Sequence, residues 1–147
     1  MGSKQSSKLI AIVDDDKSVQ SALQDLVESE GLSTLCFGSA EQFLDSGAQR
    51  NAACLIADIR MPGMSGLELQ AKLKADRCRI PIIFITAHGD AKMQTQALRE
   101  GALKFLAKPF DNTVLLEALH AAIEDQFGRF GSQIDDNARS GPSSPEI

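Results

Sequence analysis

Short runs of apolar residues alternate along this chain with longer segments in which apolar residues recur at helical spacing. The runs cover residues 9–13, 32–37, 53–57, 80–85 and 103–107. Unbroken runs such as LIAIV at 9–13 are typical of strands covered on both faces, whereas the mixed run at 32–37 is typical of a strand near an edge. The pattern therefore predicts five strands.

Each predicted strand is followed by a helical segment that begins with a capping residue. The caps are Asp16, Ser39, Ser65, Asp90 and Asp111. The pairs Ser39/Gln42 and Ser65/Glu68 also match the capping-box pattern. Five strand–helix units in succession predict an α/β fold, with a parallel sheet between two layers of helices, because each right-handed crossover covers one face.

The apolar stripes of these helices differ in strength. The first helix should end at Gly31 and bury Val19, Ala22, Leu23, Leu26 and Val27. The fifth has the most regular stripe, formed by Val114, Leu115, Ala118, Leu119, Ala122 and Ile123. The fourth, at 91–100, has only Met93, Ala97 and Leu98 to bury, and a poorly anchored helix is a candidate for movement.

Length and charge limit what the chain can be. Its 147 residues suit one domain, and residues 128–147, rich in Gly, Ser and Pro, are expected to be a disordered tail or a truncated linker. The net charge is −5 with scattered Lys and Arg, which argues against direct nucleic-acid binding by this piece.

No stretch approaches the roughly 20 apolar residues of a membrane span. Three cysteines without metal-ligand spacing fit the cytoplasm.

Chemically versatile residues follow several predicted strands. Asp14 and Asp15 follow the first strand, Asp58 the third, Thr86 the fourth and Lys108 the fifth. In a parallel sheet all of them meet at one edge. Converging carboxylates repel one another and suit Mg²⁺, while a lysine and a hydroxyl suit phosphoryl oxygens. Together they predict a phosphoryl site with an aspartate as the nucleophile.

Each of these residues also has an ordinary structural interpretation. A run of Asp before a helix caps it and favours its dipole, and an Asp after a strand is a common turn residue. Thr86 fits a strand end, and Lys-Pro fits a strand exit. Their joint occurrence, each at the end of its own strand, favours a shared site.

Four segments resemble the receiver domain of two-component response regulators. They are IVDDD at 12–16, ADIRMPGMSG at 57–66, ITAHGD at 85–90 and FLAKPF at 105–110. The resemblance covers residues 8–127. The sequences of the second and third segments are similar to those of the FixJ-like branch. It implies a flavodoxin-like (CheY-like) sheet of five parallel strands in the order 2-1-3-4-5, with five helices on both faces.

The resemblance also assigns roles. Asp58 would be the phosphoacceptor, attacking the phosphohistidine of a sensor histidine kinase in a phosphorelay. Mg²⁺, with Mn²⁺ as a substitute, would be held by Asp15, Asp58 and the backbone carbonyl of Arg60, and by Asp14 through a water. Such a domain is a signalling phosphoacceptor rather than an enzyme.

Further implied roles concern the response to phosphorylation. Thr86 and Lys108 would bind phosphoryl oxygens, the Lys108–Pro109 bond would be cis, and Thr86 with Phe105 would form the switch. The reporting surface would be the fourth helix, fifth strand and fifth helix, with a phosphorylation-dependent homodimer through the first two of these. Arg60 and His88 would tune the lifetime of the acyl phosphate, and Asp16 would only cap its helix.

Two other classes remain open from sequence. Asp14-Asp15-Asp16-Lys17-Ser18 also fits haloacid-dehalogenase-like phosphatases, with Asp14 as nucleophile and Asp16 as general acid, although no later strand ends in an acidic pair. The second is a docking module that is never phosphorylated, against which the intact acidic set argues. A flavin site is disfavoured because no phosphate loop rich in Ser, Thr and Gly follows the first strand.

Overall fold

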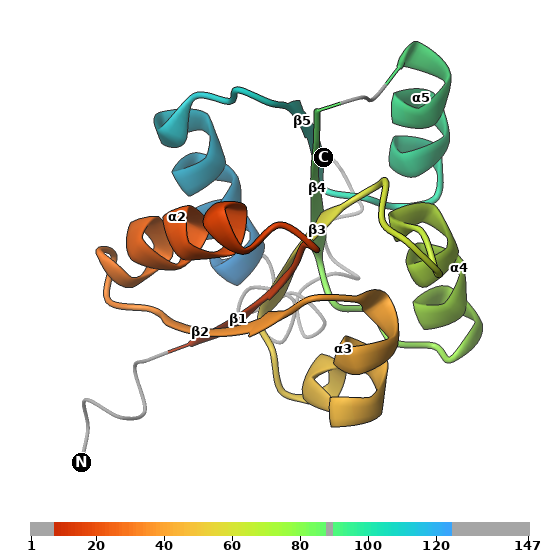
Figure 1. Cartoon of the computed structure of the whole chain (residues 1–147), viewed down its shortest axis with the longest axis horizontal. Coiled ribbons are helices and arrows are strands. Elements are labelled where there is room, and N and C mark those ends of the chain that lie inside the picture. Colours follow the sequence, from red (N-terminus) through yellow and green to blue (C-terminus); the bar gives the residue numbers. More distant parts are fainter. Residues whose placement is uncertain (1–7, 88–89, 125–147) are drawn as a thin grey trace, which may run out of the picture.

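A parallel sheet runs through the middle of the computed structural model, which describes residues 8–87 and 90–124 (Figure 1). Its strands are β1 (Leu9–Val13), β2 (Ser33–Phe37), β3 (Cys54–Asp58), β4 (Ile82–Thr86) and β5 (Lys104–Ala107). They lie in the order β2-β1-β3-β4-β5, and every neighbouring pair is parallel. The predicted sheet and its order are therefore confirmed.

Helices cover both faces of the sheet, as predicted. They are α2 (Lys17–Glu28), α3 (Ala40–Ser46), α4 (Gly66–Ala75), α5 (Ala91–Arg99) and a last helix whose described part spans 112–124, with a short 3-10 turn, η1 (Ala48–Arg50). Helices α3, α4 and α5 lie on one side, and α2 lies with the last helix on the other (Figure 1). None of the described helices has the length and apolar composition that crossing a membrane demands.

Two hydrophobic cores explain the unbroken apolar runs. Ala11 and Val13 pack into the α3–α5 core, whose buried members include Phe43, Leu69, Leu73, Phe84 and Ala97. Ile10 and Ile12 point the opposite way, into the α2 core with Leu23, Val27, Ile83, Leu115 and Leu119. Because successive strand side chains alternate between faces, a strand covered on both sides needs apolar residues throughout. The edge strand β2 leaves Leu35 46% exposed, as its mixed pattern predicts.

Helix capping follows the predictions with one correction. Ser65 and Glu68 form a complete capping box at α4, and Asp16 and Asp90 cap α2 and α5. At α3, Ser39 accepts from the N–H of Gln42, but the Gln42 side chain accepts from Gly38 N–H, one residue before the cap. The predicted Ser39/Gln42 box is therefore only half formed.

Two predicted buried positions are wrong. Ala22 is exposed, and its place in the buried face of α2 is taken by Gln20, which lies in line with Leu23 and Val27 at helical spacing. Leu98 is 42% exposed, which leaves Ala97 as the buried residue of α5. The weak anchoring predicted for this helix is thus more pronounced than expected.

A buried amide adds to the anchoring of α5. Gln70 of α4 is 4% exposed and donates from Nε2 to the carbonyl oxygen of Ala97 at 3.0 Å. A surface ion pair also joins α4 to the C-terminal end of α5, with 2.7 Å between Lys74 Nζ and Glu100 Oε1. The C-terminal end of α5 is therefore tied to α4.

Gly66, the first residue of α4, lets this helix begin directly against β3. A Cβ there would collide with the carbonyl oxygen of Asp58 and lie 2.8 Å from Ile59 Cα, both of which are backbone atoms. We expect Gly66→Ala to lower the free energy of unfolding by roughly 1–3 kcal/mol, because backbone must move to admit the methyl group. Urea unfolding followed by circular dichroism measures the change.

Gly38→Ala is the matched control for this prediction. A Cβ at Gly38 would meet the Gln42 side chain at an ordinary 3.7 Å. Equal stabilities of the Gly66 and Gly38 variants would contradict a tight approach of α4 to β3.

Candidate phosphoryl and metal site

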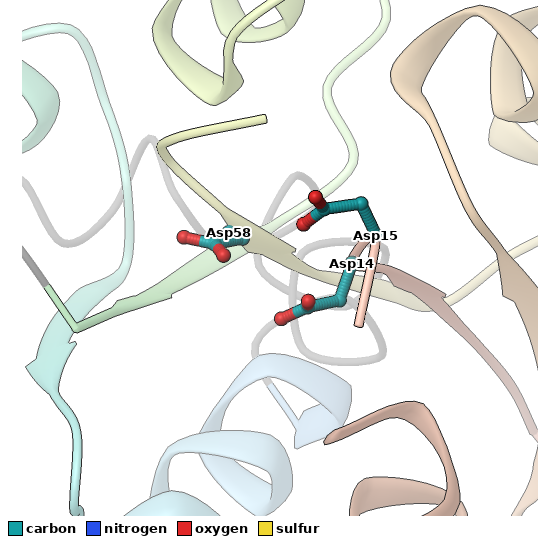
Figure 2. Close-up of side chains that lie close together, drawn as sticks. All are labelled: Asp14, Asp15 and Asp58. Atoms are coloured by element: carbon teal, nitrogen blue, oxygen red, sulfur yellow. The ribbon is translucent and has the colours of Figure 1, made fainter. Parts of the chain in front are cut away.

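The sheet gathers the predicted site residues at the carboxyl ends of its strands. Asp14 and Asp15 follow β1, Asp58 ends β3, Thr86 ends β4 and Lys108 follows β5. One oxygen from each of Asp14, Asp15 and Asp58 lies within 4.8 Å of the other two (Figure 2). Three carboxylates at this separation are a suitable donor set for a hard divalent cation.

Lys108 places a positive charge against this cluster. Its Nζ lies 3.2 Å from Asp14 Oδ2 and 3.5 Å from Asp58 Oδ2, and its side chain is 20% exposed. The backbone N–H of Lys108 donates to the carbonyl oxygen of Thr86 at 2.9 Å, and the Lys108–Pro109 peptide bond is cis, as the resemblance implies. One ammonium group thus offsets part of the charge of three carboxylates.

Burial makes the charge on Asp14 costly. This residue is 1% exposed, and removal from water raises the pKa of its carboxyl above the ordinary value. The Asp16 N–H and the Lys108 ammonium lower that pKa, and the charge of Asp58 raises it further, with burial the dominant influence. Because the buried carboxylate of Asp14 is destabilised in its charged form, a cation that binds beside it is stabilised by their attraction.

The backbone of Arg60 is fixed to the candidate phosphoacceptor. Its N–H donates to Asp58 Oδ1 at 3.2 Å, while the residue as a whole is exposed. Asp58 is 7% exposed, so the candidate phosphoacceptor is buried at the strand end. The other residue predicted to tune phosphate lifetime, His88, lies outside the described residues.

Asp16 does not belong to the cluster. Its Oδ1 accepts from the backbone N–H of Ser18 at 2.9 Å and from the Ser18 hydroxyl at 2.6 Å. These hydrogen bonds, the hydroxyl first, lower the pKa of Asp16. A lowered pKa suits a helix cap and works against a general acid, which must hold a proton near neutral pH.

Gln20 is a supporting residue that the sequence interpretation missed. It is 8% exposed, and its Nε2 donates to the carbonyl oxygens of Asp14 at 2.7 Å and of Phe37 at 3.2 Å. These bonds hold the end of β1 beside the end of β2. The available signal was a polar residue in helical register with Leu23 and Val27, a position that normally carries an apolar side chain.

Thr86 and Phe105 lie on the same face of the sheet. Thr86 is 1% exposed and alternates with Ile82 and Phe84, which pack into the α3–α5 core. Phe105 is half-buried against that core and pairs with Phe84 in the sheet register. The two predicted switch residues therefore both face the layer that contains α5.

A five-stranded parallel sheet with three carboxylates and a lysine at its carboxyl edge defines a receiver domain of a two-component response regulator. Residues 10–120 match the family model for the response regulator receiver domain. The chain belongs to this family. Receiver domains generally bind Mg²⁺ at an acidic pocket and are phosphorylated by sensor kinases, and as a class they are signal transducers rather than enzymes.

Named relatives support the same assignment. The chain is 48% identical over 118 residues to the response regulator protein TodT of Pseudomonas putida, covering 80% of this chain and 52% of TodT. It is 40% identical over 114 residues to the transcriptional regulatory protein FixJ of Azorhizobium caulinodans, covering 78% and 54%. The chain thus spans about half the length of these curated relatives.

Solved structures agree with the fold. The response regulator StyR is 39% identical, with a TM-score of 0.79 and coverage of 90% of this chain and 67% of that one. The crystal structure of FixJ-N is also 39% identical, with a TM-score of 0.73 and coverage of 80% and 94%. The predicted likeness to the FixJ branch is confirmed.

Because the buried charge of Asp14 is unfavourable, we expect its removal to stabilise the fold at the expense of the metal site. In metal-free buffer at pH 7, we expect Asp14→Asn to raise the free energy of unfolding by about 1 kcal/mol, because the amide removes a buried charge. The pKa of Asp14 is raised in the folded state, so the penalty applies above that pKa. The gain should therefore shrink as the pH falls through that raised pKa, where the carboxyl of the folded wild type becomes protonated, and it should vanish below the ordinary value of 3.8.

Urea unfolding at several pH values in the presence of a chelator measures this effect. A variant that is less stable than the wild type at pH 7 would show that the Lys108–Asp14 ion pair outweighs the burial of charge. An advantage that is independent of pH would show that it does not come from the removed charge.

Proposed function

We propose that Asp58 accepts a phosphoryl group from the phosphohistidine of a sensor histidine kinase. A carboxylate oxygen of Asp58 forms the new O–P bond as the N–P bond breaks and its electron pair stays on the imidazole nitrogen. The phosphohistidine enters protonated on its other ring nitrogen, so the products are an acyl phosphate on Asp58 and a neutral imidazole on the kinase. The observation that carries the proposal is the reach of Lys108 Nζ to both Asp14 and Asp58 at the sheet edge. An ammonium group there can pair with an incoming phosphoryl oxygen.

The proposed metal is Mg²⁺, held by Asp15, Asp58 and the Arg60 carbonyl, with Asp14 acting through a water. The donor set fits, since three carboxylate oxygens lie within 4.8 Å of one another. When bound, the ion neutralises charge on the phosphoryl oxygens and the carboxylates. The chain itself positions Asp58 through the Arg60 N–H and the Asp14 backbone through Gln20.

The proposed readout is a movement on the α5 side of the sheet. A phosphoryl group on Asp58 would draw the Thr86 hydroxyl toward it, and Phe105 would turn into the space that opens. Because both residues face the layer that holds α5, the change would reach α5 and β5, which with the last helix form the proposed reporting surface. Leu98 and Leu103, 42% and 38% exposed, give that surface apolar contacts for a homodimer.

The wider role follows from the relatives, several of which are named transcriptional regulators. We propose that residues 8–127 form the receiver and that its phosphorylation controls an output domain or a separate partner. Arg60 and His88 are proposed to set the lifetime of the acyl phosphate. The cytoplasm is the proposed location, since the free cysteines Cys36, Cys54 and Cys78 suit a reducing compartment.

Labelling with acetyl phosphate and Mg²⁺ tests the phosphoacceptor. We expect intact-mass spectrometry to show one added phosphoryl group on the wild type and none on Asp58→Asn, because the amide oxygen is a poor nucleophile. Asp45→Asn is a matched control, since Asp45 is an exposed carboxylate on α3. Steady hydrolysis of acetyl phosphate that persists in Asp58→Asn and disappears in Asp14→Asn would instead support a haloacid-dehalogenase-like phosphatase.

Thr86→Ala tests the switch. The variant should still be phosphorylated on Asp58, yet it should remain monomeric when acetyl phosphate drives the wild type toward dimer, because the hydroxyl that senses phosphate is gone. Analytical ultracentrifugation with and without acetyl phosphate gives the readout. Ser21→Ala, which removes an exposed hydroxyl on α2 away from the proposed dimer surface, serves as control. Equal dimerisation of wild type and Thr86→Ala would remove Thr86 from the switch.

A further inference from the structure

A carboxylate from α3 holds the loop that follows the candidate phosphoacceptor. Glu41 lies in the first turn of α3, and its Oε2 accepts from the backbone N–H of Met64 at 2.9 Å. The two residues are 23 positions apart in sequence. Glu41 is therefore a connection between α3 and the β3–α4 loop, which comprises residues 59–65.

The shape of the loop is matched to this carboxylate. Gly63 has a φ of +76°, a conformation that residues with a side chain rarely adopt. A Cβ at Gly63 would lie 2.8 Å from Glu41 Oε2. The backbone thus turns directly against Glu41, and glycine provides both the turn and the room for the carboxylate.

Two other hydrogen bonds fasten the ends of the same loop. The Arg60 N–H donates to Asp58 Oδ1 at 3.2 Å, and the Gly66 N–H donates to the Ile59 carbonyl oxygen at 2.8 Å. The Glu41 bond fastens the stretch between them. Since Arg60 contributes a backbone carbonyl to the proposed metal site, the path of this loop decides where that carbonyl lies.

We propose that Glu41 is a positioning residue for divalent-cation binding at Asp58. It acts through the Met64 N–H: by holding the β3–α4 loop, it keeps the backbone of Arg60 in place beside the carboxylate cluster. Glu41 itself touches neither the phosphoryl group nor the ion. The inference rests on the proposed function, because it requires a Mg²⁺ site made by Asp15, Asp58 and the Arg60 carbonyl.

Calorimetric titration of the unphosphorylated chain with Mg²⁺ tests the role directly. Glu41→Ala removes the acceptor, and Glu41→Asp keeps the charge but shortens the side chain by one methylene. Both should raise the Mg²⁺ dissociation constant roughly tenfold, in the range of supporting residues at metal sites. Glu41→Gln keeps an oxygen at the same reach without the charge and should stay within about twofold of wild type.

Asp45→Ala controls for the loss of one negative charge on the same helix. An equal loss of affinity in Glu41→Gln and Glu41→Ala would assign the effect to charge and overturn the proposal. A lower melting temperature with an unchanged Mg²⁺ dissociation constant would also overturn it, since Glu41 would then support only the fold. Because the Gln and Asp variants alter little bulk, they test the proposal even where Glu41→Ala does not fold.

Asp15→Asn separates this inference from the proposed site. Loss of Mg²⁺ binding in Asp15→Asn with normal binding in Glu41→Ala would overturn the role of Glu41 alone. Normal binding in Asp15→Asn would overturn the proposed metal site itself, and the role of Glu41 with it.

Discussion

Mutual repulsion among Asp14, Asp15 and Asp58 is the constraint on which the rest of the structure depends. Two unit charges about 4 Å apart near a protein surface interact by about 4 kcal/mol, while a whole domain is stable by only about 5–15 kcal/mol. Lys108 offsets part of this repulsion, and the two cores on either side of the sheet supply the stability that tolerates the remainder. The acidic cluster at the sheet edge is therefore carried by stability that comes from burial on both faces of the sheet.

The scaffold around the site is made mostly of backbone contacts. Gln20 holds the carbonyl oxygen of Asp14, the Arg60 N–H holds Asp58, and Gly66 brings α4 against the end of β3. Each contact fixes a main-chain position from which a carboxylate extends. Side chains at the site can then respond to charge while the strand ends stay where they are, which is what an acceptor with two states requires.

Periodicity predicted the fold well because both cores are apolar along whole strands, so the pattern in β1, β3 and β4 is unambiguous. The cluster of acidic residues followed from parallel topology, since Asp14 and Asp58 can meet only if their strands run in the same direction. Gln20 and Glu41 could not be predicted in the same way. The helical register marks Gln20 as an unusual polar residue, but its partners and that of Glu41 are backbone groups, and a backbone N–H or C=O leaves no mark in the amino-acid pattern. Leu98 was misplaced because helical spacing cannot say how wide a face its neighbours cover.

The attachment of α5 to α4 has a mechanical consequence. Gln70 and Lys74 bind α5 near Ala97 and Glu100, at its C-terminal end, whereas its N-terminal end follows the strand that carries Thr86. A helix held at one end rotates about that end. With a rise of about 1.5 Å per residue, the 9 residues of α5 form a lever of about 13 Å, so a swing of about 10° would displace its N-terminal end by about 2 Å. In the proposed switch, this attachment would turn a small shift at the strand end into a change of slope across the outer surface.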